Sequence, residues 1–249
     1  MVIPKKINPD SIKEAVVELK YQSDLPFELL LGLFVNAFDN TYTYTKRPVK
    51  TPSVLPGLLV NQNNELVINI GNQNILYNKK ISIQVLPNAF VFSCLNQYIG
   101  WNDFMPEIEK AVKQISDSNK IKIWTRVGLR YITEYKDKDL KDCLKFSFSF
   151  GLPDIQSIST VFRSEFIYNN SKVILNLQNK IPAINQQANV KQPEIIPISI
   201  IDIDVINEPL EISEFTAILE TIEDIHNTEK EIFFKMLTDD FLKSLNPEY

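Results

Sequence analysis

The stretch IKIWTRVGLRYITEYK, residues 121–136, alternates between two kinds of side chain along its whole length. A period of two residues indicates a β-strand that has one face in a core. Such a strand rises about 50 Å, far beyond the usual length of about five or six residues. We therefore expect it to run through the middle of a sheet and to pair with a strand on each side. The predicted core face carries Ile121, Ile123, Thr125, Val127, Leu129, Tyr131, Thr133 and Tyr135, and the other face carries Lys122, Trp124, Arg126, Gly128, Arg130, Ile132, Glu134 and Lys136.

The composition is that of a globular protein and excludes several other classes. Of 249 residues, 44% are hydrophobic and 23% are charged, which is ordinary for a folded domain. No apolar run is long enough to span a membrane, and the first residues lack the apolar core of a signal peptide. Cys94 and Cys143 are expected to be reduced in a cytoplasmic protein. Two cysteines and one histidine cannot build a Cys-rich or multi-histidine metal centre, and no cofactor is predicted.

The net charge of −5 is unevenly distributed. Residues 194–249 hold 14 acidic and 3 basic residues, whereas residues 1–193 hold 17 acidic and 23 basic ones. The asymmetry has two interpretations: the acidic end neutralises the basic body, or the body offers a basic surface to an anionic partner.

The order of the predicted elements gives an α+β fold. In the first half, strands are predicted at 12–22, 65–70, 73–78, 80–86 and 89–95, helices at 26–38 and 101–118, and a poorly patterned connection at 39–64. In the second half, strands are predicted at 143–150, 159–168, 171–179 and 198–206, a loop at 179–197, and one bent helix or two consecutive helices at 213–245. We therefore expect antiparallel sheets with packed helices in two sheet-helix lobes, 1–119 and 120–249. The lobes share the long central strand, and the chain ends in a long helical segment.

Three short motifs are spread over the chain. They are RVGLRYI at 126–132, IDID at 201–204 and the helical stretch LETIEDIHNTEKEIFFKMLTDD at 219–240. With the opening INPDSIKEAVVELKY, they resemble a family of proteins of about this length that occurs sporadically in bacteria and archaea. The matching positions are Arg126, Gly128, Leu129, Arg130, Tyr131, Asp202, Asp204, Ile225, His226, Phe233 and Phe234. The family has no established activity, so the resemblance implies kinship. Its sporadic distribution points to mobile or defence-associated genes.

Arg126 and Arg130 share a strand face, as do Asp202 and Asp204. On neighbouring strands, these side chains would form ion pairs. Alternatively, the two arginines form an anion site, with Gly128 leaving room for a phosphate or nucleotide. In a third interpretation, the two aspartates and Glu165 hold a divalent metal that acts on phosphoesters.

Two further candidates are weaker. The stretch YTYTKRPVK, residues 42–50, interleaves Tyr42 and Tyr44 with Lys46 and Arg47. Stacking rings beside basic charges suit single-stranded nucleic acid, although solvated loops share this composition. His226 on the last helical segment is expected to be a packing or capping residue. No nucleophile or nucleotide-binding motif is present, so no catalytic residue is predicted.

The C-terminal helical segment has more apolar positions than one face can bury. A helix on a sheet needs a single apolar face, and Phe233, Phe234, Leu237 and Phe241 spread beyond it. We expect these four residues to contact a partner protein or a second copy of the chain. The sequence thus predicts a non-enzymatic binding or interaction component of a bacterial system. The alternatives are a nucleotide or nucleic-acid binder and a metal-dependent enzyme.

Overall fold

The structure is a computed structural model that describes residues 2–38, 40–48, 72–146, 159–185 and 194–249. Its strands are β1 (Ile12–Gln22), β2 (Thr43–Pro48), β3 (Asn72–Tyr77), β4 (Ile81–Leu86), β5 (Ala89–Cys94), β6 (Ile123–Lys136), β7 (Thr160–Tyr168), β8 (Ser171–Asn185) and β9 (Glu194–Asn207). Its helices are α1 (Phe27–Phe38), α2 (Trp101–Asp117), α3 (Leu140–Cys143), α4 (Phe215–Met236) and α5 (Asp239–Ser244). No helix in these ranges is both long and apolar enough to cross a membrane.

The described strands form one sheet in the order β2-β3-β4-β5-β1-β6-β9-β8-β7. Every neighbouring pair is antiparallel, which confirms an α+β protein built on antiparallel sheet. The long strand β6 pairs with β1 on one side and with β9 on the other, as its alternation predicts. One sheet therefore crosses residue 120, so the division into two lobes at that position stays a prediction.

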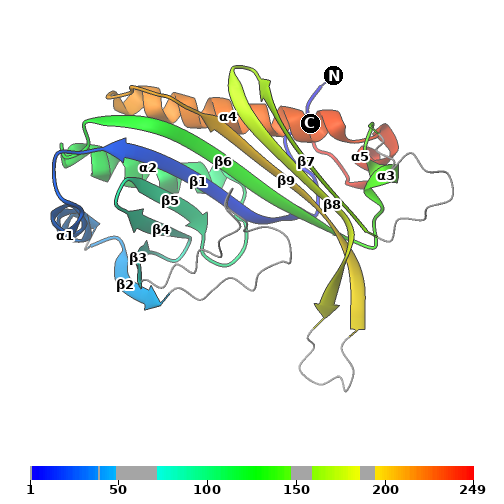
Figure 1. Cartoon of the computed structure of the whole chain (residues 1–249), viewed down its shortest axis with the longest axis horizontal. Coiled ribbons are helices and arrows are strands. Elements are labelled where there is room, and N and C mark those ends of the chain that lie inside the picture. The colour runs from blue at the N-terminus through cyan, green and yellow to red at the C-terminus, as the bar shows by residue number, and fades with distance from the viewer. Residues whose placement is uncertain (1, 39, 49–71, 147–158, 186–193) are drawn as a thin grey trace, which may run out of the picture.

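Helices cover one face of the sheet, and the core lies between them and the strands (Figure 1). Helix α4 runs along β6 and β9, and α2 packs between α1 and α4. The inward positions of β1, such as Val17 and Leu19, are fully buried there. Within the described ranges, the opposite face of the sheet carries no helix (Figure 1). That face presents the outward side chains of β6, among them Arg126 and Arg130.

A β-bulge in β6 corrects the predicted face of Trp124. Lys20 of β1 pairs with Arg126, but its neighbour Tyr21 pairs with Trp124, so Thr125 is an extra residue in β6. An extra residue reverses the inward and outward parity of the strand beyond it. Trp124 is consequently 2% exposed and packs against Tyr21 and Phe90, although plain alternation placed it beside Arg126.

Several predicted boundaries are wrong or lie outside the described residues. The connection at 39–64 contains the edge strand β2, and the loop at 179–197 is shortened because β8 and β9 extend into it as a projecting ribbon (Figure 1). At 143–146 the chain ends α3 and makes an isolated bridge from Leu144 to Leu237, where a strand was predicted. The strand predicted at 65–70 and the remainder of 143–150 are outside the described residues.

The C-terminal helical segment is divided at Leu237, which has an extended backbone between α4 and α5. Thr238 is the N-cap of α5, and its side chain accepts a hydrogen bond from the Phe241 amide. The segment does not begin at Ser213, because Glu214 is the residue that precedes α4, and α4 continues without a break to Met236. The break thus comes eight residues before the end of the segment proposed at 213–245.

We expect Thr238→Ala to lower the free energy of unfolding by about 1 kcal/mol, because it removes the only side-chain cap of α5. Ser213→Ala is the matched control: Ser213 is exposed, does not cap α4, and its replacement should change stability very little. Chemical denaturation of both variants measures the difference. Equal stabilities would show that the Thr238 cap contributes nothing.

The predicted interface at the end of α4 is not on the surface. Phe233, Phe234, Leu237 and Phe241 are all at most 8% exposed within this one chain. Phe233 and Phe234 pack edge to face, and Phe241 packs on Tyr135 of β6. The apolar side chains that exceed one helix face therefore pack inside the core of this chain. The expectation that these four residues form a partner-binding edge is wrong.

The acidic C-terminal region pairs with the basic body, in agreement with the first interpretation of the charge asymmetry. Its ion pairs with earlier residues are Asp202–Arg130, Glu208–Arg126, Asp239–Lys145 and Glu248–Lys6. The last of these joins the two ends of the chain, where the Glu248 amide also donates to the Lys6 carbonyl and the Asn8 amide donates to the Leu245 carbonyl. The terminal segments thus lie side by side.

Candidate functional site

The helix-free face of the sheet carries the predicted arginine–aspartate pair. Arg130 donates from Nε and Nη2 to the two carboxylate oxygens of Asp202, each at 2.8 Å. The Asn176 amide donates to the same carboxylate at 3.1 Å. Arg130 lies opposite Asp204 in register, so its side chain crosses diagonally to Asp202, which is only 2% exposed. The paired interpretation of these two residues is therefore the one that the structure shows.

Arg126 is also engaged by carboxylates. Its Nη1 donates to Glu18 of β1, and its Nε lies 3.3 Å from Glu208 Oε2. The guanidinium fills the space above Gly128, with Nη2 3.6 Å from where a Cβ atom would stand. The room that the sequence reserved for a phosphate is thus occupied by Arg126 itself.

The two aspartates do not form a metal centre in the described structure. Both Asp202 oxygens already accept hydrogen bonds, and Glu165 is held by Arg163 and Lys172. Burial raises the pKa of Asp204 to about 6, and the nearby arginines oppose that rise. Within the described ranges, no three His, Cys, Asp or Glu side chains are arranged to hold a metal ion.

Most of the aromatic and basic residues at 42–47 pack in the core or contact the neighbouring strand at the edge of the sheet. Tyr42 is buried and packs edge to face on Phe38. Tyr44 donates from its hydroxyl to Asn74 of the paired strand, and the Arg47 guanidinium lies over the Tyr77 ring. Lys46 is exposed. One of the two predicted stacking rings is therefore unavailable to a nucleic acid.

A pocket of about 660 Å³ lies on the helix-covered side, and it is the most complete candidate site. We call it the His226 pocket. Its floor is formed by Tyr131 and Thr133 of β6, and its walls come from the start of α2, the middle of α4 and the two terminal segments. It is lined by Lys5, Lys6, Ile7, Asp10, Ile12, Tyr98, Ile99, Gly100, Trp101, Asn102, Asp103, Tyr131, Thr133, Glu223, His226, Asn227, Glu229, Lys230, Phe233, Phe234, Glu248 and Tyr249.

His226 is the centre of an uncharged polar chain in this pocket. Its ring stacks on Trp101 with 4.0 Å between centroids, and its Nδ1 lies 3.3 Å from the Tyr131 hydroxyl. The Tyr131 hydroxyl in turn lies 3.2 Å from that of Tyr98. Burial lowers the pKa of His226 to about 3 and raises the pKa of both phenols, so all three groups are neutral at pH 7.

Glu229 lies one helical turn beyond His226 on α4 and also lines the pocket. It is 5% exposed, and its carboxyl has no hydrogen bond or ion pair within the described residues. Burial raises its pKa to about 8, with a further increase from Asp10 and a decrease from Lys230. At pH 7 Glu229 is therefore mainly a neutral carboxylic acid, and perturbed acids of this kind gather at functional sites.

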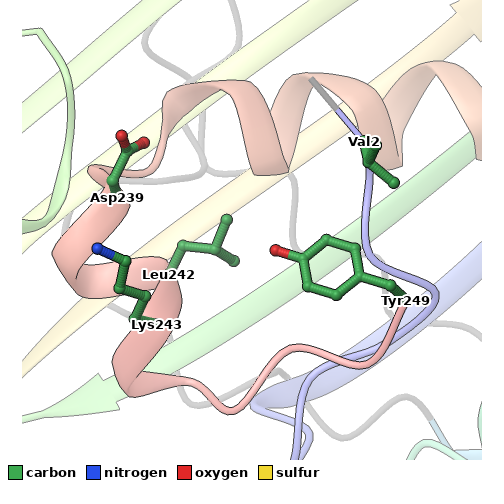
Figure 2. A pocket seen from close by; sticks show the side chains of 5 residues that line it. All are labelled: Val2, Asp239, Leu242, Lys243 and Tyr249. Atoms are coloured by element: carbon green, nitrogen blue, oxygen red, sulfur yellow. The ribbon is translucent and has the colours of Figure 1, made fainter.

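A second hollow, of about 640 Å³, adjoins the chain ends and is less suited to a ligand. Figure 2 shows the Leu242 side chain of α5 and the Tyr249 ring facing one another across it. Val2, Asp239 and Lys243 complete its lining. Asp239 pairs with Lys145 and Lys243 with Asp240, and none of the five side chains is a buried polar group.

Sequence reasoning missed most of the His226 pocket. The motif around Tyr131 and the Ile225-His226 pair were both singled out, and the structure brings Tyr131 and His226 into contact. Glu229, however, looks like any charge on a helix, Trp101 is the first residue of α2, and Tyr98 lies in the loop before α2. The available signal was spacing: Glu229 follows His226 by three residues, which places both on one helix face.

Comparison of the sequence with protein-family models and with curated proteins finds no match. The resemblance drawn from the short motifs therefore stays a prediction.

Proposed function

We propose that this protein is a binding protein that holds a small molecule in the His226 pocket. The observation that carries the proposal is Glu229, a buried carboxyl that lines a pocket and has no hydrogen-bond or ion-pair partner among the described residues. Buried polar groups are almost always hydrogen-bonded, and a bound molecule would supply the missing partner. The neutral hydroxyls of Tyr98 and Tyr131 beside it provide directional contacts, as small-molecule sites normally do.

The alternatives on the open sheet face have less support. A nucleotide or nucleic-acid binder using Arg126 and Arg130 would have to separate both arginines from carboxylates. A metal-dependent enzyme acting through Asp202 and Asp204 would have to displace Arg130 from Asp202. Truncating one partner of such a pair is costly, so we favour the pocket. A place in a bacterial defence system and a cytoplasmic location stay predictions.

The proposal is tested with a fragment library that contains cationic, anionic and neutral members, by ligand-observed NMR and by soaking crystals. We expect the hits to converge on the His226 pocket. Asn227 is an exposed pocket residue of α4, and Asn227→Trp should close the mouth and remove these hits. Asp224→Trp adds the same ring on the same helix outside the pocket lining and should retain them. Hits that are scattered, or that survive Asn227→Trp, would contradict the proposal.

A further inference from the structure

We infer that the His226 pocket takes a small organic cation, an ammonium ion carried on an apolar or aromatic group, whose charge is met by Glu229 and Asp10. The inference rests on the proposed function and names the chemical class of its ligand. Three features of the pocket carry it: an unpartnered acid, an excess of negative charge once that acid is ionised, and a lining rich in aromatic rings.

The first feature is the Glu229 carboxyl, which is 5% exposed and has no partner within the described residues. It borders the pocket, so a ligand can reach it. A neutral hydrogen-bonding ligand would satisfy one oxygen of the acid. An ammonium ion would satisfy the carboxylate more strongly, because hydrogen bonds between charged groups are about twice as strong as neutral ones.

The second feature is the balance of the charges that line the pocket. Most of them are already engaged: Glu248 pairs with Lys6, Asp103 with Lys80, and Glu223 accepts from the Trp101 indole. Lys5 donates to the Tyr249 carbonyl. In the described structure, the side chains left without an opposite charge are three acids and two bases, namely Asp10, Glu223, Glu229, Lys5 and Lys230. Once Glu229 is ionised, these side chains carry one negative charge in excess, which a bound cation neutralises.

The third feature is the lining itself. The negative faces of aromatic rings attract ammonium groups, most strongly where water is excluded. Ring side chains in the pocket come from the loop before α2, from α2, β6 and α4, and from the C-terminal segment. They are Tyr98, Trp101, Tyr131, Phe233, Phe234 and Tyr249. Carboxylates combined with such rings form a typical environment for an organic ammonium ion.

An anion would meet weaker complementarity. The start of α2 borders the pocket, and a helix N-terminus favours negative charge. Asp103 in the first turn of α2 already supplies a negative charge at that end of the helix. Lys5 and Lys230 are the basic groups without a carboxylate partner, and an anion placed beside Lys230 would also lie near Asp10, which repels it.

Binding of an ammonium ion should ionise Glu229. The free pocket holds a neutral carboxyl, which faces Asp10 and Lys5 from the N-terminal segment, Tyr98 and Tyr131, and His226 and Lys230 of its own helix. When the ammonium ion contacts it, the carboxyl O–H bond breaks, the carboxylate pairs with the ligand, and the proton passes to the buffer. With a pKa of about 8 before binding, Glu229 should release about one proton per bound ligand at pH 7.

The test uses three probes of one shape: benzylammonium, benzyl alcohol and benzoate. Titration calorimetry at pH 7, in two amine-free buffers with different ionisation enthalpies, reports both affinity and proton release. We expect benzylammonium to bind at least about tenfold more tightly than the other two and to release about one proton. Glu229→Gln should lose the preference and the proton, and Asp10→Asn should lose part of the preference. Glu220→Gln, which removes an exposed acid of the same helix, should lose neither.

The inference is overturned if benzoate or benzyl alcohol binds as tightly as benzylammonium, if Glu229→Gln leaves the preference unchanged, or if benzylammonium fails to bind at millimolar concentration. The two proposals fail separately. If neutral or anionic fragments occupy the pocket, the protein is still a binding protein, but its ligand is not an organic cation. If no fragment occupies the pocket, the proposal that the protein binds a small molecule there is wrong.

Discussion

Arg130→Ala is expected to lower the free energy of unfolding by about 3 kcal/mol, at the low end of the range for a broken buried ion pair. The reason is the partner that remains. Asp202 is 2% exposed and would keep only the Asn176 amide as a donor. The Arg130 side chain is 41% exposed, so water offsets part of what the pair contributes.

Chemical denaturation of the wild type and the variant measures this loss. Lys113→Ala breaks an exposed i,i+4 pair with Asp117 and serves as the control, with a loss of about 0.5 kcal/mol or less. The double variant Arg130→Met, Asp202→Leu should recover most of the stability, because it leaves no buried charge without a partner. If Arg130→Ala unfolds like the wild type but loses affinity for an anion such as inorganic phosphate, then Arg130 is a ligand residue.

Glu229 should make the protein less stable as the pH rises through neutrality. Its pKa is 4.5 in an unfolded chain and about 8 in the fold, so between these values the folded state holds a proton that the unfolded state has released. Stability therefore falls across that window as the pH increases. His226 acts in the opposite direction: its pKa is lowered from 6.5 to about 3, and its contribution is lost as the pH falls below 6.5.

The window from pH 6.5 to 8 separates the two groups, because the His226 contribution changes there by only about 0.4 kcal/mol and is the same in the wild type and in Glu229→Gln. In this window, the free energy of unfolding of the wild type should fall by about 2 kcal/mol relative to that of Glu229→Gln. Denaturant titrations at both pH values measure the difference. Parallel pH profiles for the wild type and Glu229→Gln would show that the carboxyl already ionises near its ordinary pKa in the fold.

The regular parts of the fold could be predicted because strand alternation and helix periodicity are local properties. The bounds of β1 are those predicted at 12–22, and the strands predicted at 159–168 and 171–179 are joined at Asn169 and Asn170, which both have positive φ, as a tight hairpin turn requires. The Thr125 bulge has no such signal. It is defined by the partner strand, where Lys20 and Tyr21 pair with residues that are two apart in β6.

The candidate site was harder to predict because it is assembled from distant segments. Arg130 and Asp202 could be paired from matching strand faces and opposite charge. The burial of Phe234 and Phe241 could not, since the width of an apolar helix face does not reveal how many neighbours surround it. Nothing near Glu229 in the sequence shows that its side chain is enclosed, because the enclosing residues come from both ends of the chain.

The contact between the chain ends also sets when the pocket can exist during synthesis. Residues 5–8 are synthesised long before residues 245–248, and they contact these residues only after the intervening chain has been made. At a translation rate of about 5–20 residues per second, many seconds pass between the synthesis of residues 5–8 and that of residues 245–248. The nascent chain can pair β1 with β5 and later with β6, but a ligand of the His226 pocket finds a complete site only after Glu248 and Tyr249 have been added.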